Sequence, residues 1–590
     1  MKVLYKFYKF YKYIYKMLDT GIYITILVIV INVYLQSIAT QAAPLKPKSV
    51  IPKDFSPKVT PKVPTEPTKL PHPDRLLPLL KTPTSPSPSF PLNNNLELII
   101  VKKFEVTGSS VFSDRELDAI TTPYLDQPLS IFELLQIRTK ITELYIDRGY
   151  ITSGAYLPEQ DLQKGIVKIQ IVEGGLAEIK IKGLTRLNED YIKSRLVIAT
   201  GKPLNRNRLL EALQLLQINP LIENISANLS PSLQSGFNDL EVKVTEAPTF
   251  SLPITLDNSR TPSVGSERRQ IQLNEANLTG IGDRLSISYS NTNGSNAFDV
   301  SYTIPFNPNN GTIGMNFGTS VSNVIEPPFN ILDITSNSRN YELTLRQPIL
   351  QNTVQDLALG LSLSHRQSSA SLLNGLIPFP SIETGTDGQT RVTALRFFQE
   401  YVQRSAEEVF AVRSQINLGL KALGSTINLN APDSQFVSWR GQMQYVRLFA
   451  PETLLLLRTD LQLSDRPLLS QEQINFGGQD NLRGYRQDAL LSDNGLLLSM
   501  EMRIPLLRLP EISGLLQIIT FYDFGTVWNH QAETNPDPST LASVGVGLRF
   551  QVSDRLTIRI DLGIPLSRIF AEKKTLQENG IYFSILTNPF

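Results

Sequence analysis

The chain has 590 residues, of which 56 are basic and 55 acidic, so its net charge indicates neither nucleic acid nor another strongly charged partner. It contains no cysteine, which excludes disulfides, thiol catalysis and cysteine-based metal sites. Its three histidines are scattered without ligand spacing, so we expect no metal, no cofactor and no enzymatic acid/base centre.

The amino terminus has the layout of an export signal. A lysine-rich segment precedes an apolar core from Ile22 to Leu35, and small residues around Ala39 and Ala42 offer cleavage sites. The core is short for spanning a bilayer of about 30 Å. Residues 1–42 are therefore predicted to be a signal peptide, with a retained membrane anchor as the alternative. In either case the mature chain leaves the cytoplasm.

Residues 43–95 are rich in proline, lysine, serine and threonine. Such a segment lacks the apolar content to fold and favours extended conformations. We interpret it as a semi-rigid linker, and a ligand for a proline-recognition domain is the alternative. It has no long helical pattern, so a helix that plugs a pore is not expected from it.

One pattern then occurs twice, with its glycines Gly108 and Gly183 about 75 residues apart. Each copy begins with a strand, continues with helical periodicity and closes with a second strand. The helices are expected at 131–147 and 208–217, and Ser113 and Asn188 are expected to cap the short helices before them. The sequence therefore predicts two small α+β domains, at 96–175 and 176–248.

The first copy also carries a run of spaced positions that are mostly polar, aromatic or glycine. They are Gly149, Tyr150, Tyr156, Leu157, Pro158, Gln160, Asp161, Glu173 and Gly174. This run resembles the first POTRA domain of two-partner-secretion transporters, the family of the hemolysin and filamentous-haemagglutinin activators. A plain interpretation, in which these residues only build turns and a core, is compatible with that resemblance.

After residue 248 the hydrophobic period changes to two and stays so. Arg555 to Leu562, for example, alternates charged with aliphatic residues. Such segments can close into a ring with apolar side chains toward lipid and polar ones toward a wet lumen, and a mean hydropathy of -0.09 suits this arrangement. We expect sixteen strands, near 249–257, 268–276, 283–291, 297–304, 312–321, 339–346, 354–364, 390–402, 408–418, 435–446, 453–463, 495–504, 515–524, 542–550, 555–563 and 580–590.

Residues 249–590 are thus predicted to form an antiparallel transmembrane β-barrel, preceded by the two α+β domains. An even strand count places both barrel ends on one side of the membrane, which suits domains attached at the first strand. The alternative architecture is a soluble β-propeller or solenoid. The export signal, the lack of a fixed blade repeat and the terminal Phe590 argue against it.

A loop at about 464–494 interrupts this array, and loops of that length are usually functional or disordered. It contains Leu482-Arg483-Gly484-Tyr485, and a later strand contains Phe521-Tyr522-Asp523-Phe524-Gly525. The two motifs resemble the inward-folded sixth loop of the Omp85 superfamily and its partner on the inner wall. That loop usually has valine or isoleucine where Leu482 stands.

The resemblance implies a lumenal latch in which Arg483 pairs with Asp523. Leu482, Gly484, Tyr485, Phe521 and Gly525 belong to the two motifs, while Glu501 and Arg503, on the lumenal face, are possible members of the network. The alternative is an ordinary extracellular turn with a solvated Asp523. A guanidinium can bind a carboxylate through two hydrogen bonds, although desolvation limits the net gain.

The resemblance implies a bacterial-type outer-membrane pore that captures an unfolded exoprotein through periplasmic POTRA domains and secretes it through the barrel. The partners implied are that client, outer-membrane lipid and, during biogenesis, the barrel assembly machinery. The first alternative is an Omp85-type factor that assembles other outer-membrane proteins, and the second is a passive porin. Two POTRA copies with the first-domain residues favour secretion.

Overall fold

The structure is a computed structural model that describes residues 76–77 and 98–590, apart from residues 163, 235, 380, 382, 386, 431, 531–534, 568 and 570–572. The predicted signal peptide at 1–42 and nearly all of the predicted linker at 43–95 lie outside the described residues. In the part of the chain that is described, no helix is both long and apolar enough to cross a bilayer.

The first α+β unit packs two helices against a three-stranded sheet of order β2-β5-β4. β2 and β5 are parallel, and β4 is antiparallel to β5. Leu134, Ile137 and Ile141 of α5 lie in one buried cluster with Val167 and Ile169 of β5. The elements are β1 (Ile99–Ile100), β2 (Lys103–Thr107), α4 (Asp114–Thr121), β3 (Pro128–Leu129), α5 (Ile131–Asp147), β4 (Gly154–Tyr156) and β5 (Ile166–Val172).

The second unit repeats this plan with a sheet of order β6-β8-β7, in which β6 and β8 are parallel. Its core joins Leu209 and Leu213 of α7 to Leu240 and Val242 of β8. The elements are β6 (Gly175–Lys182), α6 (Glu189–Ala199), α7 (Arg206–Gln217), β7 (Ile222–Pro231) and β8 (Phe237–Glu246).

Both predicted long helices are present, the first with the expected ends. Ser113 and Asn188 are N-cap residues as predicted, and Ser113 forms a capping box with Glu116. The third strand of each sheet was not predicted. β4 has only three residues, and β7 mixes its apolar positions with asparagine and serine, so neither shows a strong strand pattern.

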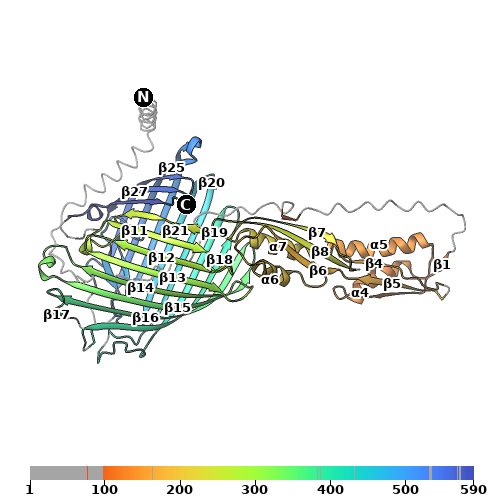
Figure 1. Cartoon of the computed structure of the whole chain (residues 1–590), viewed down its shortest axis with the longest axis horizontal. Coiled ribbons are helices and arrows are strands. Elements are labelled where there is room, and N and C mark those ends of the chain that lie inside the picture. The colour runs from red at the N-terminus through yellow and green to blue at the C-terminus, as the bar shows by residue number, and fades with distance from the viewer. Residues whose placement is uncertain are drawn as a thin grey trace. The chain divides into compact units, whose positions relative to one another are not determined.

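Sixteen antiparallel strands form the barrel, and they run side by side around it in Figure 1. β10 closes the ring by pairing with β28, from Ile254 opposite Thr587 to Asp257 opposite Ser584. The strands are β10 (Ile254–Asp257), β11 (Arg268–Ala276), β12 (Arg284–Asn291), β13 (Ser295–Pro305), β14 (Thr312–Asn323), β15 (Thr335–Gln351), β16 (Gln355–Leu372), β18 (Gln389–Arg404), β19 (Glu408–Leu420), β20 (Val437–Ala450), β21 (Thr453–Ser464), β24 (Asn494–Leu509), β25 (Gly514–Trp528), β26 (Thr540–Val552), β27 (Leu556–Pro565) and β28 (Ile581–Thr587).

Every predicted strand overlaps one of these sixteen. The main difference is length, since β15 and β16 extend well beyond the predicted 339–346 and 354–364. Their extensions are rich in serine, asparagine and glutamine, which weakens the period-two hydrophobic pattern. Two-residue strands β9 (Phe250–Ser251) and β17 (Ile377–Pro378) pair with the ends of β11 and β16.

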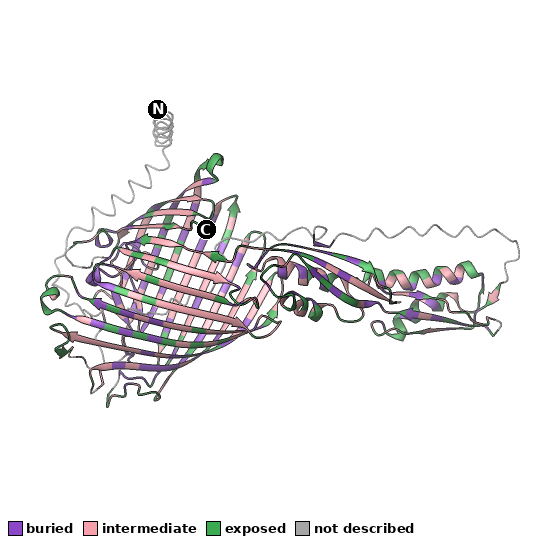
Figure 2. Cartoon of the chain, viewed as in Figure 1, coloured by how far each residue is buried: buried purple, intermediate pink, exposed green. Residues whose placement is uncertain are grey.

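Burial alternates along the barrel strands, as Figure 2 shows. In β16, Leu361 and Leu363 are exposed whereas Ser362 and Ser364 are buried. This is the reverse of a soluble sheet, in which the apolar face is covered. An exposed apolar outer face around a polar interior is the arrangement that a bilayer stabilises.

Candidate functional site

The segment between β21 and β24 turns into the barrel interior. The sequence predicts a loop without secondary structure at 464–494, and the structure adds a short hairpin within it, β22 (Ile474–Phe476) and β23 (Leu490–Ser492). Gly477 and Gly478 follow β22 with φ angles of 122° and 96°. Glycine adopts this region without a steric penalty, so the chain can turn sharply toward the wall there. We call residues 465–493 the lumenal loop.

Arg483 lies at the tip of the lumenal loop and makes a two-pronged ion pair with Asp523 of β25. Nε donates to Oδ2 at 2.7 Å and Nη2 donates to Oδ1 at 2.8 Å, while the backbone N–H donates to Oδ2 at 3.1 Å. The two side chains are 4% and 0% exposed. A guanidinium fork on a carboxylate has defined geometry, so this contact fixes the orientation of the tip as well as its position.

Glu501 of β24 is the second carboxylate at the tip. Nη1 of Arg483 donates to its Oε2 at 2.7 Å, Nη2 of Arg559 to the same oxygen at 2.8 Å, and Nε of Arg503 to Oε1 at 2.7 Å. Arg559 also donates from Nε to Asp561 at 2.6 Å. Arginine and carboxylate charges thus alternate, which offsets the desolvation of each buried ion.

The aromatic ring of Phe521 covers the other side of Arg483, with the guanidinium carbon 3.5 Å from the ring centroid. The ring needs space on the neighbouring strand, because a Cβ atom at Gly545 would lie 2.1 Å from its Cζ atom. Ser499 completes the surroundings by donating to Oδ1 of Asp523 at 2.6 Å. The site therefore combines ionic, cation–π and hydrogen-bond contacts in a small volume.

The backbone of Gly484 passes directly over the barrel wall with a φ of 92°. Its N–H donates to the hydroxyl of Tyr582 at 2.9 Å, and that hydroxyl donates to the carbonyl of Tyr485 at 2.6 Å. A Cβ atom at Gly563 of β27 would lie 2.5 Å from the Gly484 nitrogen. Glycine is thus required on both sides of this close approach.

Tyr485 and Leu482 flank the tip and pack it against the wall. The Tyr485 hydroxyl donates to the carbonyl of Ala542 at 2.7 Å and accepts from the Ser567 N–H at 3.1 Å. Leu482 is fully buried, and a Cβ atom at Gly525 would lie 2.6 Å from its Cδ1 atom. The lack of a side chain at Gly525 makes room for Leu482.

The structure thus brings together every residue of the predicted latch, including Glu501 and Arg503. Sequence reasoning missed Arg559, Asp561, Tyr582 and Gly563. Two signals were present: charged residues alternate along 555–562, and small residues recur at 543–547. Neither signal shows that these positions face a loop from elsewhere in the chain.

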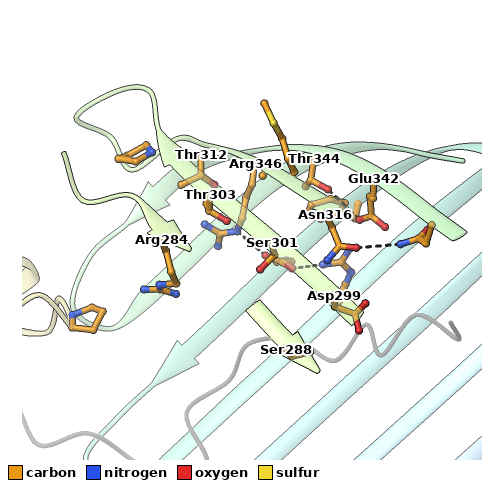
Figure 3. Close-up of a pocket in the computed structure, with 18 of the residues that line it drawn as sticks. Arg284, Ser288, Asp299, Ser301, Thr303, Thr312, Asn316, Glu342, Thr344 and Arg346 are labelled. Atoms are coloured by element: carbon orange, nitrogen blue, oxygen red, sulfur yellow. Dashed lines mark hydrogen bonds and ion pairs between the residues drawn. The ribbon is translucent and has the colours of Figure 1, made fainter. Parts of the chain in front are cut away.

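A polar cavity of about 1020 Å³ lies along the opposite part of the lumen. Figure 3 shows its wall on β12 to β15, where Arg284, Asp299, Glu342 and Arg346 lie among serine, threonine and asparagine side chains. The lining reaches from Asn310, in the turn after β13, to Arg260, in the loop after β10. The lumenal loop therefore leaves a space lined by polar side chains within the barrel.

In the first α+β unit, Glu173 joins three segments. Its carboxylate accepts from the backbone and hydroxyl of Ser110, from the Val111 N–H and from the Tyr145 hydroxyl. Burial alone would raise the pKa of Glu173, but these hydrogen bonds hold it below the ordinary value. Burial raises the pKa of Tyr145 to about 12, so its hydroxyl remains a donor.

The other residues of the first-domain resemblance occupy turns and edges. Gln160 donates to the Lys168 carbonyl at 2.8 Å and accepts from the Lys168 N–H, so its side chain pairs with β5 as a strand would. A Cβ atom at Gly174 would lie 2.2 Å from the Thr152 carbonyl oxygen. Gly149 ends α5 with a φ of 90°. Tyr150 and Leu157 pack on the core, Tyr156 is exposed, and Pro158 and Asp161 lie in the segment between β4 and β5.

Two profiles of known protein families match the barrel and the first α+β unit. The profile described as Haemolysin secretion/activation protein ShlB/FhaC/HecB matches residues 236–550, and that of the POTRA domain, ShlB-type, matches residues 99–174. The outer membrane transporter CdiB of Dickeya dadantii is 23% identical over 79% of this chain and 83% of its own. The hemolysin transporter protein ShlB of Serratia marcescens is 22% identical over 71% and 73%.

A solved structure agrees in fold. CdiB from Escherichia coli superimposes with a TM-score of 0.64 at 22% identity, over 85% of this chain and 93% of that one. A closed sixteen-stranded barrel with an apolar outer face, preceded by POTRA domains, defines an outer-membrane β-barrel protein, and the family profile makes it a transporter. The chain belongs to the haemolysin secretion/activation protein family ShlB/FhaC/HecB. It is a translocation pore of two-partner secretion in the outer membrane, and its POTRA domains are periplasmic.

The location of the POTRA domains orients the barrel. Because they precede β10 from the periplasm, β10 runs outward and the antiparallel strands alternate from there. The lumenal loop follows β21, the eleventh strand of the barrel, and therefore starts and ends at the extracellular side.

Proposed function

We propose that the lumenal loop is the gate of this secretion pore and that Arg483 is its latch. The observation that carries the proposal is the buried contact of Arg483 with Asp523 and Glu501 on two neighbouring strands. All of the tip contacts described above are non-covalent. The tip can therefore leave the wall as a unit and widen the route along the polar cavity.

The POTRA domains supply the capture step of this mechanism. β2 and β4 are the edges of the first sheet, and β6 and β7 are those of the second. An extended peptide can add to such an edge through backbone hydrogen bonds, which suits many sequences and a client that is not yet folded. Folding of the client outside the cell would then drive its transport forward.

The outer face of the barrel supports lipid as a partner. Leucines such as Leu343, Leu345 and Leu361 point outward and are exposed on long strands. Insertion of such a barrel requires its strands to be paired before they meet lipid, because unpaired backbone groups are costly in hydrocarbon. We include the barrel assembly machinery among the partners on this ground.

The test of the latch is the Arg483→Ala variant. We expect it to abolish secretion of the client, because two carboxylates lose their shared cation, while the amount of folded, heat-modifiable barrel stays unchanged. Arg447→Ala is the matched control, since Arg447 forms an exposed pair with Glu408. Normal secretion by Arg483→Ala would refute the latch.

The capture step has its own test. Deletion of about residues 97–175 should block binding of the unfolded client but leave the barrel able to conduct ions in planar bilayers. An unchanged affinity for the client after this deletion would show that the first POTRA domain is not the docking site.

A further inference from the structure

The first limb of the lumenal loop, residues 465–473, has a buried ion cluster of its own. Glu472 accepts from Nη1 of Arg366 at 3.0 Å and from Nη2 of Arg396 at 2.8 Å. The three side chains are at most 6% exposed. Arg366 belongs to β16 and Arg396 to β18, so Glu472 fixes this limb to a part of the wall that the tip does not touch.

Apolar and backbone contacts strengthen the same attachment. Leu468 and Leu469 share a buried cluster with Val392, Ala394 and Phe436. Leu468 also forms a backbone bridge with Asp433 in the loop after β19. The limb is therefore held by charge, by packing and by main-chain contact within a few residues.

The base of the loop is tied to this limb as well. The carboxylate of Asp493, at the other end of the loop, accepts from the Leu468 N–H and from the Gln473 side chain, both at 2.9 Å. The latch contacts of Arg483 and Gly484 lie on β24, β25 and β28, whereas the ion pairs of Glu472 and the bridge of Leu468 lie on β16, β18 and the loop after β19. The two attachments share no residue, and Gly477 and Gly478 stand between them.

We propose that Glu472 is a positioning residue that keeps the first limb on the wall when the tip leaves its latch. The loop then opens as a hinged hairpin, residues 474–492, and does not leave the lumen as a whole. This inference rests on the proposed gating of the pore by the loop. It assigns different roles to two buried carboxylate clusters. Glu472 stays paired with its arginines through the transport cycle, whereas Asp523 and Glu501 lose their contact with Arg483 when the tip leaves.

Engineered disulfides can separate the two roles, because the chain has no cysteine of its own. Asp433→Cys with Leu468→Cys joins two bridge partners and fixes the limb. Leu482→Cys with Gly525→Cys fixes the tip, where the leucine already lies over the glycine. Each oxidised variant is compared with its own reduced form, so that any effect of the substitutions themselves on folding, insertion or the latch is common to both.

With the limb fixed, we expect secretion within about two-fold of the reduced form. With the tip fixed, secretion should fall at least about ten-fold and return on reduction. A block by the limb disulfide would overturn the hinge. If secretion is unchanged once the tip disulfide has formed, the gating on which the inference rests is overturned.

A labelling experiment tests the role of Glu472 without secretion. Leu469→Cys introduces a single buried thiol into the limb, and its reaction with a water-soluble maleimide reports release of the limb. Glu472→Gln should raise the labelling rate at least about five-fold, whereas Arg483→Ala and Glu452→Gln should not. Glu452 serves as control because its pair with Arg508 is largely exposed.

Two results of the labelling would contradict the proposal. If Arg483→Ala alone exposes the limb thiol, the loop is released as one unit. If Glu472→Gln leaves the thiol protected, the ion cluster does not hold the limb.

The double variant Glu472→Gln/Arg396→Gln should label more slowly than Glu472→Gln. In Glu472→Gln two guanidiniums have lost their carboxylate, and the second substitution removes one of them.

Discussion

At the scale of single residues, the latch depends on glycines around Arg483 as much as on the charged residues that it contacts. Arg483 reaches two carboxylates because Gly484 and Gly563 let the loop and wall backbones approach, and Gly525 and Gly545 leave room for Leu482 and Phe521. Removing one partner from a buried ion pair costs about 3–5 kcal/mol, more than most exposed pairs contribute. A side chain added at Gly484 or Gly563 should therefore act through the same contact as changes at the arginine.

Gly563→Ala tests this directly. Its Cβ would lie 2.5 Å from the Gly484 nitrogen, so we expect the tip to be displaced at a cost of about 1–3 kcal/mol. Secretion should fall toward the level of Arg483→Ala, measured as exoprotein in the medium. Gly314→Ala is the matched control, because a Cβ there, on β14, would meet its nearest atom at 3.7 Å. Equal secretion by the two variants would contradict the close approach.

At the scale of elements, the two POTRA domains share one local arrangement, a glycine turn followed by a segment that binds a carboxylate. After the first strand of each, Gly108 and Gly183 take φ angles of 96° and 92°, and the next segment binds a carboxylate at the end of the last strand. In the first domain this carboxylate is Glu173. In the second it is Glu246, which accepts from the backbone of Thr185, Arg186 and Leu187. Hydrogen bonds hold the pKa of both carboxyls down against the effect of burial.

The lowered pKa of Glu173 sets the sign of a pH effect. The carboxylate binds a proton less tightly when folded, so its stabilisation is complete above the ordinary pKa of 4.5 and is lost as the pH falls through the lower folded value. Glu173→Gln should destabilise the first domain by about 1–3 kcal/mol at pH 7 and by less in acid.

Hydrogen exchange of residues 98–174 in the intact protein measures this difference as a function of pH. Glu159→Gln, at an exposed position in the same domain, should change exchange little at any pH. A pH-independent effect of Glu173→Gln would show that the charge of the carboxylate does not matter.

At the scale of the whole molecule, the barrel fold allows a chain with many polar residues to span a membrane. Each long strand places apolar side chains outward and polar ones toward the lumen, and the pairing of β10 with β28 joins the first and last strands of the ring. The same closure creates the two lumenal walls to which the loop attaches. Barrel and gate thus follow from one alternating pattern.

Adjacent residues of β15 test this division of faces. Leu343 is exposed on the outer face near the middle of the strand, and Thr344 lines the polar cavity. Leu343→Arg should cost about 2–4 kcal/mol and lower the amount of heat-modifiable barrel, because the charge enters hydrocarbon. Thr344→Arg should leave that amount nearly unchanged. Similar losses in both variants would contradict the assigned faces.

The sequence by itself determined the sixteen strands, the long helix of each POTRA domain and the residues of the latch motifs. These follow from local periods of 2 and 3.6 residues, or from short motifs that resemble a known family. Strand ends were less accurate where serine and asparagine dilute the pattern, as in β15 and β16.

Beyond the expected pair of Arg483 with Asp523, only the tertiary structure decided which charges meet. Arg559, Asp561 and Tyr582 follow the motif by more than 70 residues, and Arg366 and Arg396 precede Glu472 by more than 70. Ring closure and the infolding of the loop bring these side chains into contact. The physical reason is that strand periodicity fixes the face to which a side chain points, whereas its partner across a lumen depends on how the whole sheet curves and closes.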